Sequence, residues 1–254
     1  VPTAGFALTE LPGRGIQRRL TVANLSAVAA LLRGLVRGVG LVRRTRPDVV
    51  VVLGGYASFA CGVGAVLTRR PLVLLEQNAR AGAVNRVLRR FAAASAVSFA
   101  GTDLPRQVVT GNPLRPEVVA AALARDADPA GSRRTARREL DLPDDRTVWL
   151  DPTGSLGARK VNTAVRELVD RWAERTDVAI RHVIGRRDFA TVSADAPVLP
   201  DGGLVYQAVE YEDAMATALA AADVAVTRAG GGVAELAALG VPAVLVPLPI
   251  APRE

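Results

Sequence analysis

The sequence predicts an α/β protein with two domains, each built around a parallel sheet. Two apolar runs, residues 49–55 and 148–157, end in glycine-rich turns and lead into helix-like stretches. A strand, turn and helix in this order present backbone amides to a phosphate group in many parallel-sheet proteins. Because the unit recurs in the second half of the chain, we expect two nucleotide-type domains that face a shared cleft.

The spacing of apolar residues predicts the elements of both domains. An amphipathic helix over residues 21–44 comes first. In the first half, we expect strands at 49–53, 72–75, 96–99 and 107–110 and helices at 57–68 and 82–91. In the second half, we expect strands at 147–151, 178–184, 204–207, 223–227 and 242–246 and helices at 132–139, 159–174, 211–220 and 232–239. Apolar strands that are each followed by a helix are typical of a parallel sheet covered on both faces.

The two domains are expected to meet at residues 111–116, where two prolines interrupt the alternation. This places one domain at 1–115 and the other at 116–254. The chain starts with Val1 rather than methionine, and it stops soon after an apolar strand with no closing helix. We therefore expect a fragment in which both domains are truncated.

The composition limits the partners of the protein. The net charge is +7 and the pI is near 10.7, which favours an anionic partner such as nucleic acid, a phospholipid surface or a phosphorylated small molecule. Aromatic residues make up only 4% and are not interleaved with basic ones, so we expect no nucleic-acid partner. A single cysteine, Cys61, excludes an internal disulfide framework and fits a reducing cytoplasm. No apolar run is long enough to span a bilayer.

The helix expected at 21–44 has two interpretations. It can cover the first sheet, as helices of α/β domains do. It can also rest an apolar edge and its arginines, such as Arg37 and Arg44, on an anionic bilayer, which would make a membrane surface a partner.

Two glycine turns of the second half are candidate phosphate sites. In the turn at 154–159, small residues allow backbone amides to approach an anion, and Ser155 adds a hydroxyl donor. Tight packing alone would also explain these glycines. In the second turn, Gly230–Gly232 precede Glu235, which falls in the first turn of a helix. Its carboxylate could accept hydrogen bonds from ribose hydroxyls or could simply complement the helix dipole.

Other polar residues are weaker candidates. Residues 76–78 follow a strand and suit a sugar or a peptide, unless they form an ordinary surface turn. Arg115 lies in a rigid turn between the domains, where it could reach a substrate oxygen. His182, the only histidine, lies in an apolar strand and is expected to be a buried core residue. Asp126 and Asp128 follow a helix-like run rather than a strand, so we expect no metal site there.

Several of these motifs together resemble those of the MurG family, and the resemblance runs nearly end to end. The residues that carry it are 46–50 with 54–58, 76–78 with 85–86, 109–115, 154–159 with Asn162, and 228–230 with 235–242. Members of this family move N-acetylglucosamine from UDP onto lipid I, the undecaprenyl-diphosphate-linked muramyl peptide, and so form lipid II for peptidoglycan. The resemblance therefore implies a GT-B fold, with two Rossmann-like domains and an interdomain cleft.

The resemblance also assigns substrates and residues. UDP-N-acetylglucosamine would bind mainly the C-terminal domain and lipid I the N-terminal one, at the cytoplasmic face of the plasma membrane. The transfer would invert the anomeric centre and need no cofactor or bound metal. The donor diphosphate would meet Ser155 with Gly154, Leu156 and Gly157; the ribose would meet Glu235 with Gly230, Gly231, Gly232, Val233 and Ala234; and the uracil would meet the main chain at Glu212. Asn78 and Arg115 would face the sugar and the cleft, and Gly54 and Gly55 would hold the acceptor diphosphate.

Some features depart from the family pattern. The family's first glycine loop, with a histidine often proposed as the base, would lie before Val1, and a glutamine-bearing segment would lie beyond Glu254. The turn at 230–235 is one residue shorter than usual, Glu212 stands where an apolar residue is common, and Thr153 replaces a glycine. We therefore expect this piece alone to be inactive. A non-catalytic relative that binds a nucleotide-sugar or a polyprenyl diphosphate, and a GT-B transferase with another lipid acceptor, remain alternatives.

Overall fold

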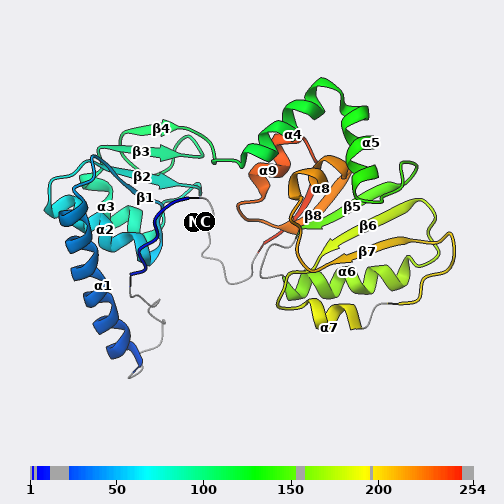
Figure 1. The fold of residues 1–254 in the computed structure, drawn as a ribbon, viewed down its shortest axis with the longest axis horizontal. Coiled ribbons are helices and arrows are strands. Elements are labelled where there is room, and N and C mark those ends of the chain that lie inside the picture. The colour runs from blue at the N-terminus through cyan, green and yellow to red at the C-terminus, as the bar shows by residue number, and fades with distance from the viewer. Residues whose placement is uncertain (1, 3–4, 12–22, 153–157, 195–196, 248–254) are drawn as a thin grey trace. The chain divides into compact units, whose positions relative to one another are not determined.

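The chain forms two compact units, Val1–Pro113 and Leu114–Arg253. The computed structural model describes residues 2, 5–11, 23–152, 158–194 and 197–247 (Figure 1). The division falls inside the proline-containing segment expected to join the domains. Each unit contains one parallel sheet, which confirms the predicted α/β class.

The first unit follows the predicted order of elements. These are α1 (Ala23–Thr45), β1 (Val50–Val52), α2 (Gly55–Leu67), β2 (Leu72–Glu76), α3 (Ala83–Leu88), a 3₁₀ turn (Arg89–Phe91), β3 (Ala94–Val97) and β4 (Gln107–Val109). The strands pair in the order β1-β2-β3-β4, with Val50 opposite Leu72 and Val73 opposite Ala94.

The first sheet is covered by helices on one face only in the part of the chain that the structure describes. Successive strands of this sheet are neighbours, and right-handed connections then place every connecting helix on the same side. Val52, Leu72 and Leu74 pack in the core on that side, where α2 and α3 lie (Figure 1). On the opposite side, Val51 and Leu53 are 46% and 64% exposed. The prediction of a sheet covered on both faces is therefore wrong for this described part.

Helix α1 packs closely against α2. At Gly38, an added Cβ would lie 2.6 Å from the Cβ of Ala60 and 2.8 Å from its carbonyl carbon. Val42, one turn further along, is buried in the core of the first unit. Leu32 and Val36 are 58% and 72% exposed. The helix therefore covers α2 with one side and leaves part of its apolar surface in solvent.

This close crossing predicts that Gly38→Ala lowers the free energy of unfolding by about 1–3 kcal/mol, the usual range for an overpacked core. Gly40→Ala is the matched control on the same helix, because a Cβ there would meet no described atom within 4 Å. We expect the control to be neutral or to stabilise by up to about 1 kcal/mol. Urea denaturation measures both, and equal destabilisation by the two variants would contradict the close crossing.

The second unit contains a five-stranded sheet and helices on both of its faces. Its elements are α4 (Pro116–Ala127), α5 (Pro129–Glu139), β5 (Thr147–Pro152), α6 (Arg159–Arg171), β6 (Val178–Val183), α7 (Phe189–Ala194), β7 (Val205–Val209), α8 (Met215–Ala221), β8 (Val224–Arg228), α9 (Val233–Ala238) and β9 (Ala243–Val246). The predicted list of elements omitted α4 and α7. Pro116 occupies the first position of α4, where proline is favourable, although its presence in the sequence indicates a break.

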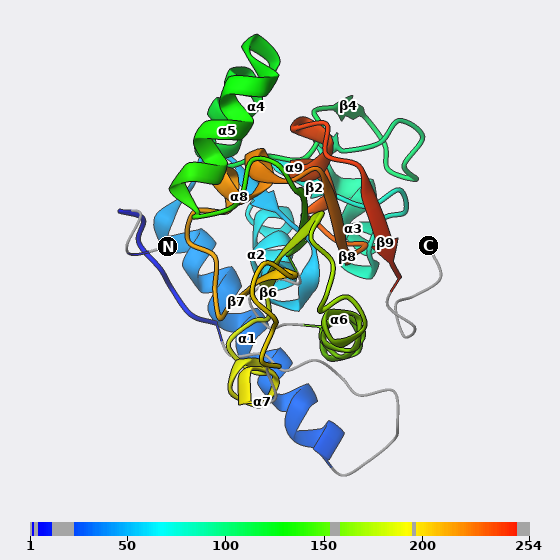
Figure 2. The ribbon, with the colours of Figure 1, turned by 90° about the vertical axis from the view of Figure 1, so that its right-hand side faces the viewer.

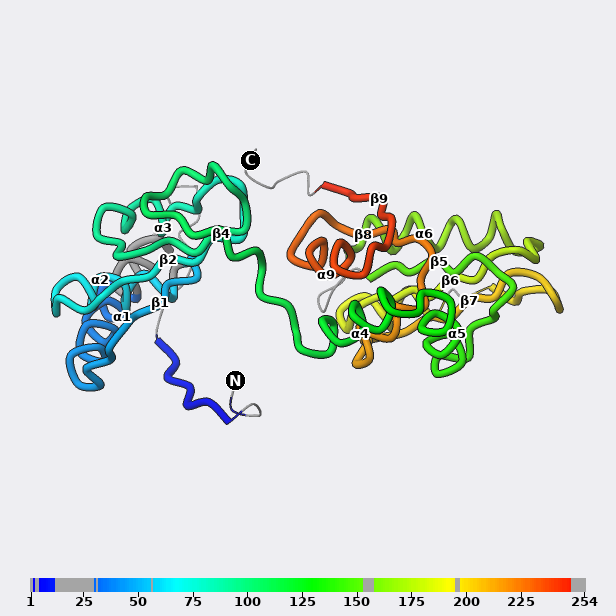
Figure 3. Tube along the Cα trace, turned by 90° about the horizontal axis from the view of Figure 1, so that it is seen from above, coloured from blue at the N-terminus to red at the C-terminus, as the bar shows by residue number. Residues whose placement is uncertain are grey.

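The strand order β7-β6-β5-β8-β9 explains why both faces of this sheet are covered. The chain moves outward from β5 to β7 and then returns to the other side of β5 for β8 and β9. Right-handed connections therefore place α6 on one face and α8 and α9 on the other, as Figures 1 and 2 show. Figure 3 shows the neighbouring β5 and β8 within this unit. Open parallel sheets bind ligands at such a reversal, outside the carboxyl ends of the strands.

Candidate functional site

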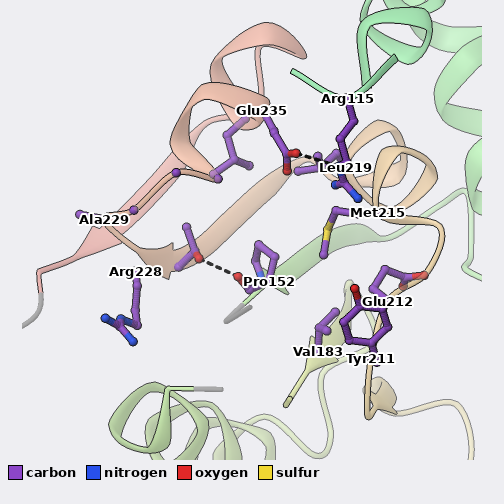
Figure 4. A pocket seen from close by; sticks show the side chains of 15 residues that line it. Arg115, Pro152, Val183, Tyr211, Glu212, Met215, Leu219, Arg228, Ala229 and Glu235 are labelled. Atoms are coloured by element: carbon purple, nitrogen blue, oxygen red, sulfur yellow. Dashed lines mark hydrogen bonds and ion pairs between the residues drawn. The ribbon is translucent and has the colours of Figure 1, made fainter. Parts of the chain in front are cut away.

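A cavity of about 370 Å³ lies at this reversal in the second unit (Figure 4). Pro152 at the end of β5, Val183 at the end of β6 and Arg228 at the end of β8 contribute to its wall. The loop after β7, helix α8, the turn before α9, the start of α9 and Arg115 supply the rest of the lining. The cavity is large enough for a small organic ligand, because such sites usually measure about 300–1,000 Å³.

The cavity brings together six of the residues predicted to bind the donor. These residues are Arg115, Glu212, Gly230, Gly231, Gly232 and Glu235. Val233 and Ala234 belong to the same turn and the start of α9 but do not line the cavity. The binding roles of all eight stay predictions.

Glu235 and Arg115 form an ion pair on one side of the cavity. The Nε atom of Arg115 donates to Oε1 of Glu235 over 3.1 Å, and the side chains are 50% and 20% exposed. Glu235 lies in the first turn of α9, and Arg115 is the residue that precedes α4. The carboxylate therefore already has a partner within the second unit.

Glu212 lines the cavity and belongs to a buried polar cluster. Its Oε2 accepts a 2.7 Å hydrogen bond from Nε of Arg181, and its Oε1 accepts one from the backbone N–H of Ala214. Arg181 also donates to Oε1 of Gln207 over 2.6 Å. The side chains of Arg181 and Glu212 are only 13% and 4% exposed. The ion pair fixes the loop between β7 and α8, and it explains how a carboxylate can replace an apolar residue there.

Two of the glycines before α9, Gly230 and Gly232, are not required by the described structure. Gly232 has a φ of −64°, which any residue can adopt. A Cβ at Gly232 would meet no described atom within 4 Å, and one at Gly230 would meet only the carbonyl oxygen of Arg228, at 4.0 Å. Neither backbone conformation nor packing among the described residues therefore explains the choice of glycine.

Arg228 lines the cavity and was not among the predicted site residues. Its Nε atom is buried and has no hydrogen-bond partner among the described residues, and its side chain pairs with no carboxylate there. The neighbouring Thr227 hydroxyl donates to the carbonyl of Pro152 over 2.9 Å and so ties β8 to the end of β5. A basic residue at a strand end, just before a glycine turn, is the sequence signal that could have identified Arg228.

A second polar cluster lies under the face of the sheet that α6 covers. Nε2 of His182 lies 3.1 Å from Oδ1 of Asn162 and 3.3 Å from Oδ2 of Asp151, and its Nδ1 lies 3.0 Å from the hydroxyl of Tyr206. His182 is fully buried, which confirms the prediction of a core histidine. Burial lowers the pKa of His182 to about 4 and raises the pKa of Tyr206 to about 12. Both groups are therefore neutral at pH 7.

Asp151 is a buried carboxyl group with no hydrogen-bond partner for either oxygen among the described residues. Burial raises its pKa well above the ordinary value of 3.8. The unfolded chain thus loses this proton at lower pH than the folded chain does. Stability contributed by the protonated form is present below pH 3.8 and is lost as the pH rises through the folded pKa.

Asp151→Asn is therefore expected to gain stability relative to the parent protein as the pH rises from 4 to 8. The amide stays neutral in both states and has nearly the same shape. His182 has the opposite pH dependence, because its contribution to stability is lost as the pH falls from 6.5 towards 4. This contribution is present in both proteins and therefore cancels in the comparison. Urea denaturation at pH 4, 6 and 8 measures the difference between the two free energies of unfolding. A difference that does not change with pH would contradict the raised pKa.

The candidate residues of the first unit have structural roles in the described geometry. Both oxygens of Glu76 accept hydrogen bonds, from the backbone and side chain of Asn78 and from Gly82 and Asn85. The Asn78 side chain is thus held in a turn, at an exposed position. Gly54 and Gly55 have φ values of 79° and 74°, which by themselves favour glycine. Contact of these residues with a diphosphate or a sugar stays a prediction.

Two further groups of candidates remain. One lies outside the described residues, and in the other a carboxylate serves as a helix cap. Gly154, Ser155, Leu156 and Gly157 lie outside the described residues, so their expected contact with the donor diphosphate stays a prediction. Asp128 is the N-cap of α5, and its Oδ1 accepts a 2.9 Å hydrogen bond from the backbone N–H of Gly131. This cap accounts for the presence of a carboxylate at position 128.

Comparison with known proteins identifies the family. Residues 1–97 match the glycosyltransferase family 28 N-terminal domain, and residues 153–254 match its C-terminal domain. A protein of Nocardioides sp. named UDP-N-acetylglucosamine–N-acetylmuramyl-(pentapeptide) pyrophosphoryl-undecaprenol N-acetylglucosamine transferase is 40% identical over 100% of this chain and 67% of its own length. The protein of the same name from Salinibacter ruber is 39% identical over 98% of this chain and 65% of its own length.

Solved structures agree with this assignment. The crystal structure of Acinetobacter baumannii MurG has a TM-score of 0.61 and 26% sequence identity, and the match covers 93% of this chain and 63% of that one. Staphylococcus aureus MnaA in complex with UDP, at 16% identity and a TM-score of 0.59, shares the fold. The two parallel-sheet units thus have the GT-B architecture that the sequence predicts. The chain spans about two thirds of the length of the curated relatives that it matches, and it belongs to the MurG family of glycosyltransferase family 28.

Proposed function

We propose that the protein carrying this chain transfers N-acetylglucosamine from UDP to lipid I, with inversion at the anomeric carbon, and so forms lipid II. The observation that carries the proposal is the cavity at the strand reversal of the second unit. No described neighbour requires glycine at positions 230 and 232, and both line the cavity, where they leave space for a ligand against the backbone. Relatives named for this transfer match the whole chain.

The charges around the cavity favour an anionic ligand. Glu212 is neutralised by Arg181, and Glu235 by Arg115. Arg228 then supplies positive charge that no carboxylate balances among the described residues. We assign the ribose to Glu235, the uracil to the main chain at Glu212 and the diphosphate to Arg228 with the glycine turn. The turn around Ser155 would contribute further amides.

In this mechanism the second unit acts on the leaving group. The departing UDP carries growing negative charge, and amides and a guanidinium held in place would stabilise it without reorganising. Arg115 and Asn78 would face the sugar end of the donor diphosphate, and Gly54 and Gly55 would hold the acceptor diphosphate. Positioning two large substrates lowers the barrier further by reducing the entropy lost in the reaction. We assign the proton-accepting base to none of the described residues.

The test is turnover of UDP-N-acetylglucosamine and lipid I by the gene product that carries residues 1–254. Glu235→Ala is expected to lower kcat/KM by about tenfold or more, since a hydrogen bond to a charged group contributes about 1.5–3 kcal/mol. Glu117→Ala, an exposed change on α4, is the matched control. Undiminished turnover in Glu235→Ala would remove this residue from its role.

One observation favours a second candidate, a relative that binds but does not catalyse. The turn from Gly230 to Glu235 is compact, with the backbone N–H of Val233 donating to Gly230 and that of Glu235 to Gly232. A shortened turn could hold a nucleotide-sugar without aligning it for transfer. Tight UDP binding combined with no turnover of lipid I by the same gene product would support this alternative. A screen of other polyprenyl-diphosphate acceptors separates it from a transferase with a different acceptor.

We further propose that α1 attaches the protein to the cytoplasmic face of an anionic membrane. Exposed Leu32 and Val36 lie one turn apart on α1, and Arg37 and Arg44 flank this ridge. Buried apolar area and attraction to anionic lipid together drive such binding. No helix in the described part of the chain is both long and apolar enough to cross a bilayer.

The test is sedimentation with liposomes. Leu32→Ser with Val36→Ser is expected to reduce pelleting, and liposomes without anionic lipid should pellet less protein than anionic ones. Leu67→Ser, at an equally exposed leucine at the end of α2, is the control. Equal pelleting with both kinds of liposome would contradict the electrostatic part of the proposal.

A further inference from the structure

The ion pair between Arg115 and Glu235 occupies the carboxylate to which the proposed function assigns the ribose. Figure 4 shows the two side chains reaching toward each other from α9 and from the segment before α4. Only one contact joins them, from Nε of Arg115 to Oε1 of Glu235. Within the described residues, neither side chain has another hydrogen-bond or ion-pair partner. A ligand that uses Oε1 of Glu235 therefore competes with Arg115.

This pair is easy to separate. The Arg115 side chain is half exposed, and the contact uses one nitrogen and one oxygen rather than the two parallel bonds of the strongest arginine–carboxylate pairs. Exposed ion pairs of this kind stabilise a protein only slightly. Whether a ligand separates the pair therefore depends on the hydrogen bonds that it can form with Arg115 and with Glu235.

A nucleoside diphosphate offers a replacement to both partners, whereas a nucleoside offers one to Glu235 alone. Two adjacent ribose hydroxyls can donate to the two oxygens of a carboxylate. Phosphate oxygens give a guanidinium a charge-assisted acceptor that matches its planar geometry. With uridine, Arg115 would lose its carboxylate and gain nothing. The ion pair therefore lowers the affinity of the cavity for a ligand that lacks phosphate.

We propose that Arg115 is a partner-exchanging residue that makes the cavity selective for nucleoside diphosphates over nucleosides. In the empty cavity it neutralises Glu235. When a nucleoside diphosphate binds, the ribose hydroxyls take the carboxylate and the phosphate takes the guanidinium. This inference rests on the proposed function, because it places the ribose at Glu235.

The test compares two ligands and four proteins. UDP is titrated by calorimetry and uridine by NMR line broadening, against the parent protein, Arg115→Ala, Glu235→Gln and the double variant. Arg115→Ala is expected to strengthen uridine binding and to weaken UDP binding, so that the ratio of the two affinities falls by about tenfold or more, the effect of one charge-assisted hydrogen bond. In the Glu235→Gln background, Arg115→Ala should no longer strengthen uridine binding, because the competing pair is already broken.

A control and two contrary outcomes complete the test. Arg134→Ala removes an exposed arginine of α5 and should leave the ratio unchanged. If Arg115→Ala weakens uridine and UDP equally, Arg115 supports the cavity without exchanging partners, and the inference is overturned while the proposed function stands. If the folded parent protein binds no UDP, the proposed function fails, and this inference fails with it.

Discussion

Glu212→Ala is expected to lower the free energy of unfolding of the second unit by about 3–5 kcal/mol, the usual effect of removing one partner from a buried ion pair. The substitution would leave the guanidinium of Arg181 buried and without its carboxylate. The backbone N–H of Ala214 would also lose its acceptor. Urea denaturation followed by tryptophan fluorescence measures this directly, because Trp149 and Trp172, the only tryptophans, stack on each other within the second unit.

A double variant separates charge burial from simple loss of packing. Arg181→Met with Glu212→Leu removes both charges and keeps apolar volume, and such replacements of buried ion pairs are often neutral or stabilising. In this variant Gln207 loses one donor and the backbone N–H of Ala214 still lacks its acceptor, so we expect recovery of more than half of the lost stability rather than all of it. A double variant as unstable as Glu212→Ala would show that the buried charge of Arg181 is not the cause.

Gly232→Val is expected to weaken UDP binding by about tenfold or more, a change of at least about 1.4 kcal/mol, while folding stability changes by less than about 1 kcal/mol. A Cβ at this position would meet no described atom within 4 Å, so the described residues leave space beside it. It would, however, fill space beside the backbone in the cavity. Calorimetry with UDP and urea denaturation give the two quantities.

The matched control is Ala237→Val, which adds a β-branched side chain at an exposed position of the same helix, outside the cavity. It should change neither UDP affinity nor stability by more than the small helix-propensity cost of valine. Equal UDP affinity in Gly232→Val and the parent protein would mean that the ligand does not approach this glycine.

The sequence predicts the fold well where the structure depends on local pattern. Apolar runs mark the strands of both sheets, including those of the first sheet, where Val51 is exposed on the uncovered face. The pattern fails where the signal is short or ambiguous. Helix α7 has six residues and buries none of them, and Pro116 starts a helix at a position that indicates a break. Coverage of the first sheet depends on strand order, which no periodicity reveals.

The candidate site is predictable in part for the same reason. The glycine turn and Glu235 are adjacent in the sequence and lie together in the cavity. The polar contacts between side chains of neighbouring strands depend on strand register instead. Arg181 lies opposite Gln207, and Asp151 lies opposite His182, only because β5, β6 and β7 pair in one particular alignment. A sequence pattern does not specify that alignment, so the buried ion pair and the buried carboxyl become visible only in the structure.

Calorimetric titration of the gene product that carries residues 1–254 with UDP decides whether the cavity between β5 and β8 is a nucleotide site. We expect saturable binding that Glu235→Ala and Gly232→Val both weaken, in proteins whose tryptophan fluorescence shows a folded second unit. A silent titration of the folded parent protein, or binding that neither substitution changes, would contradict it.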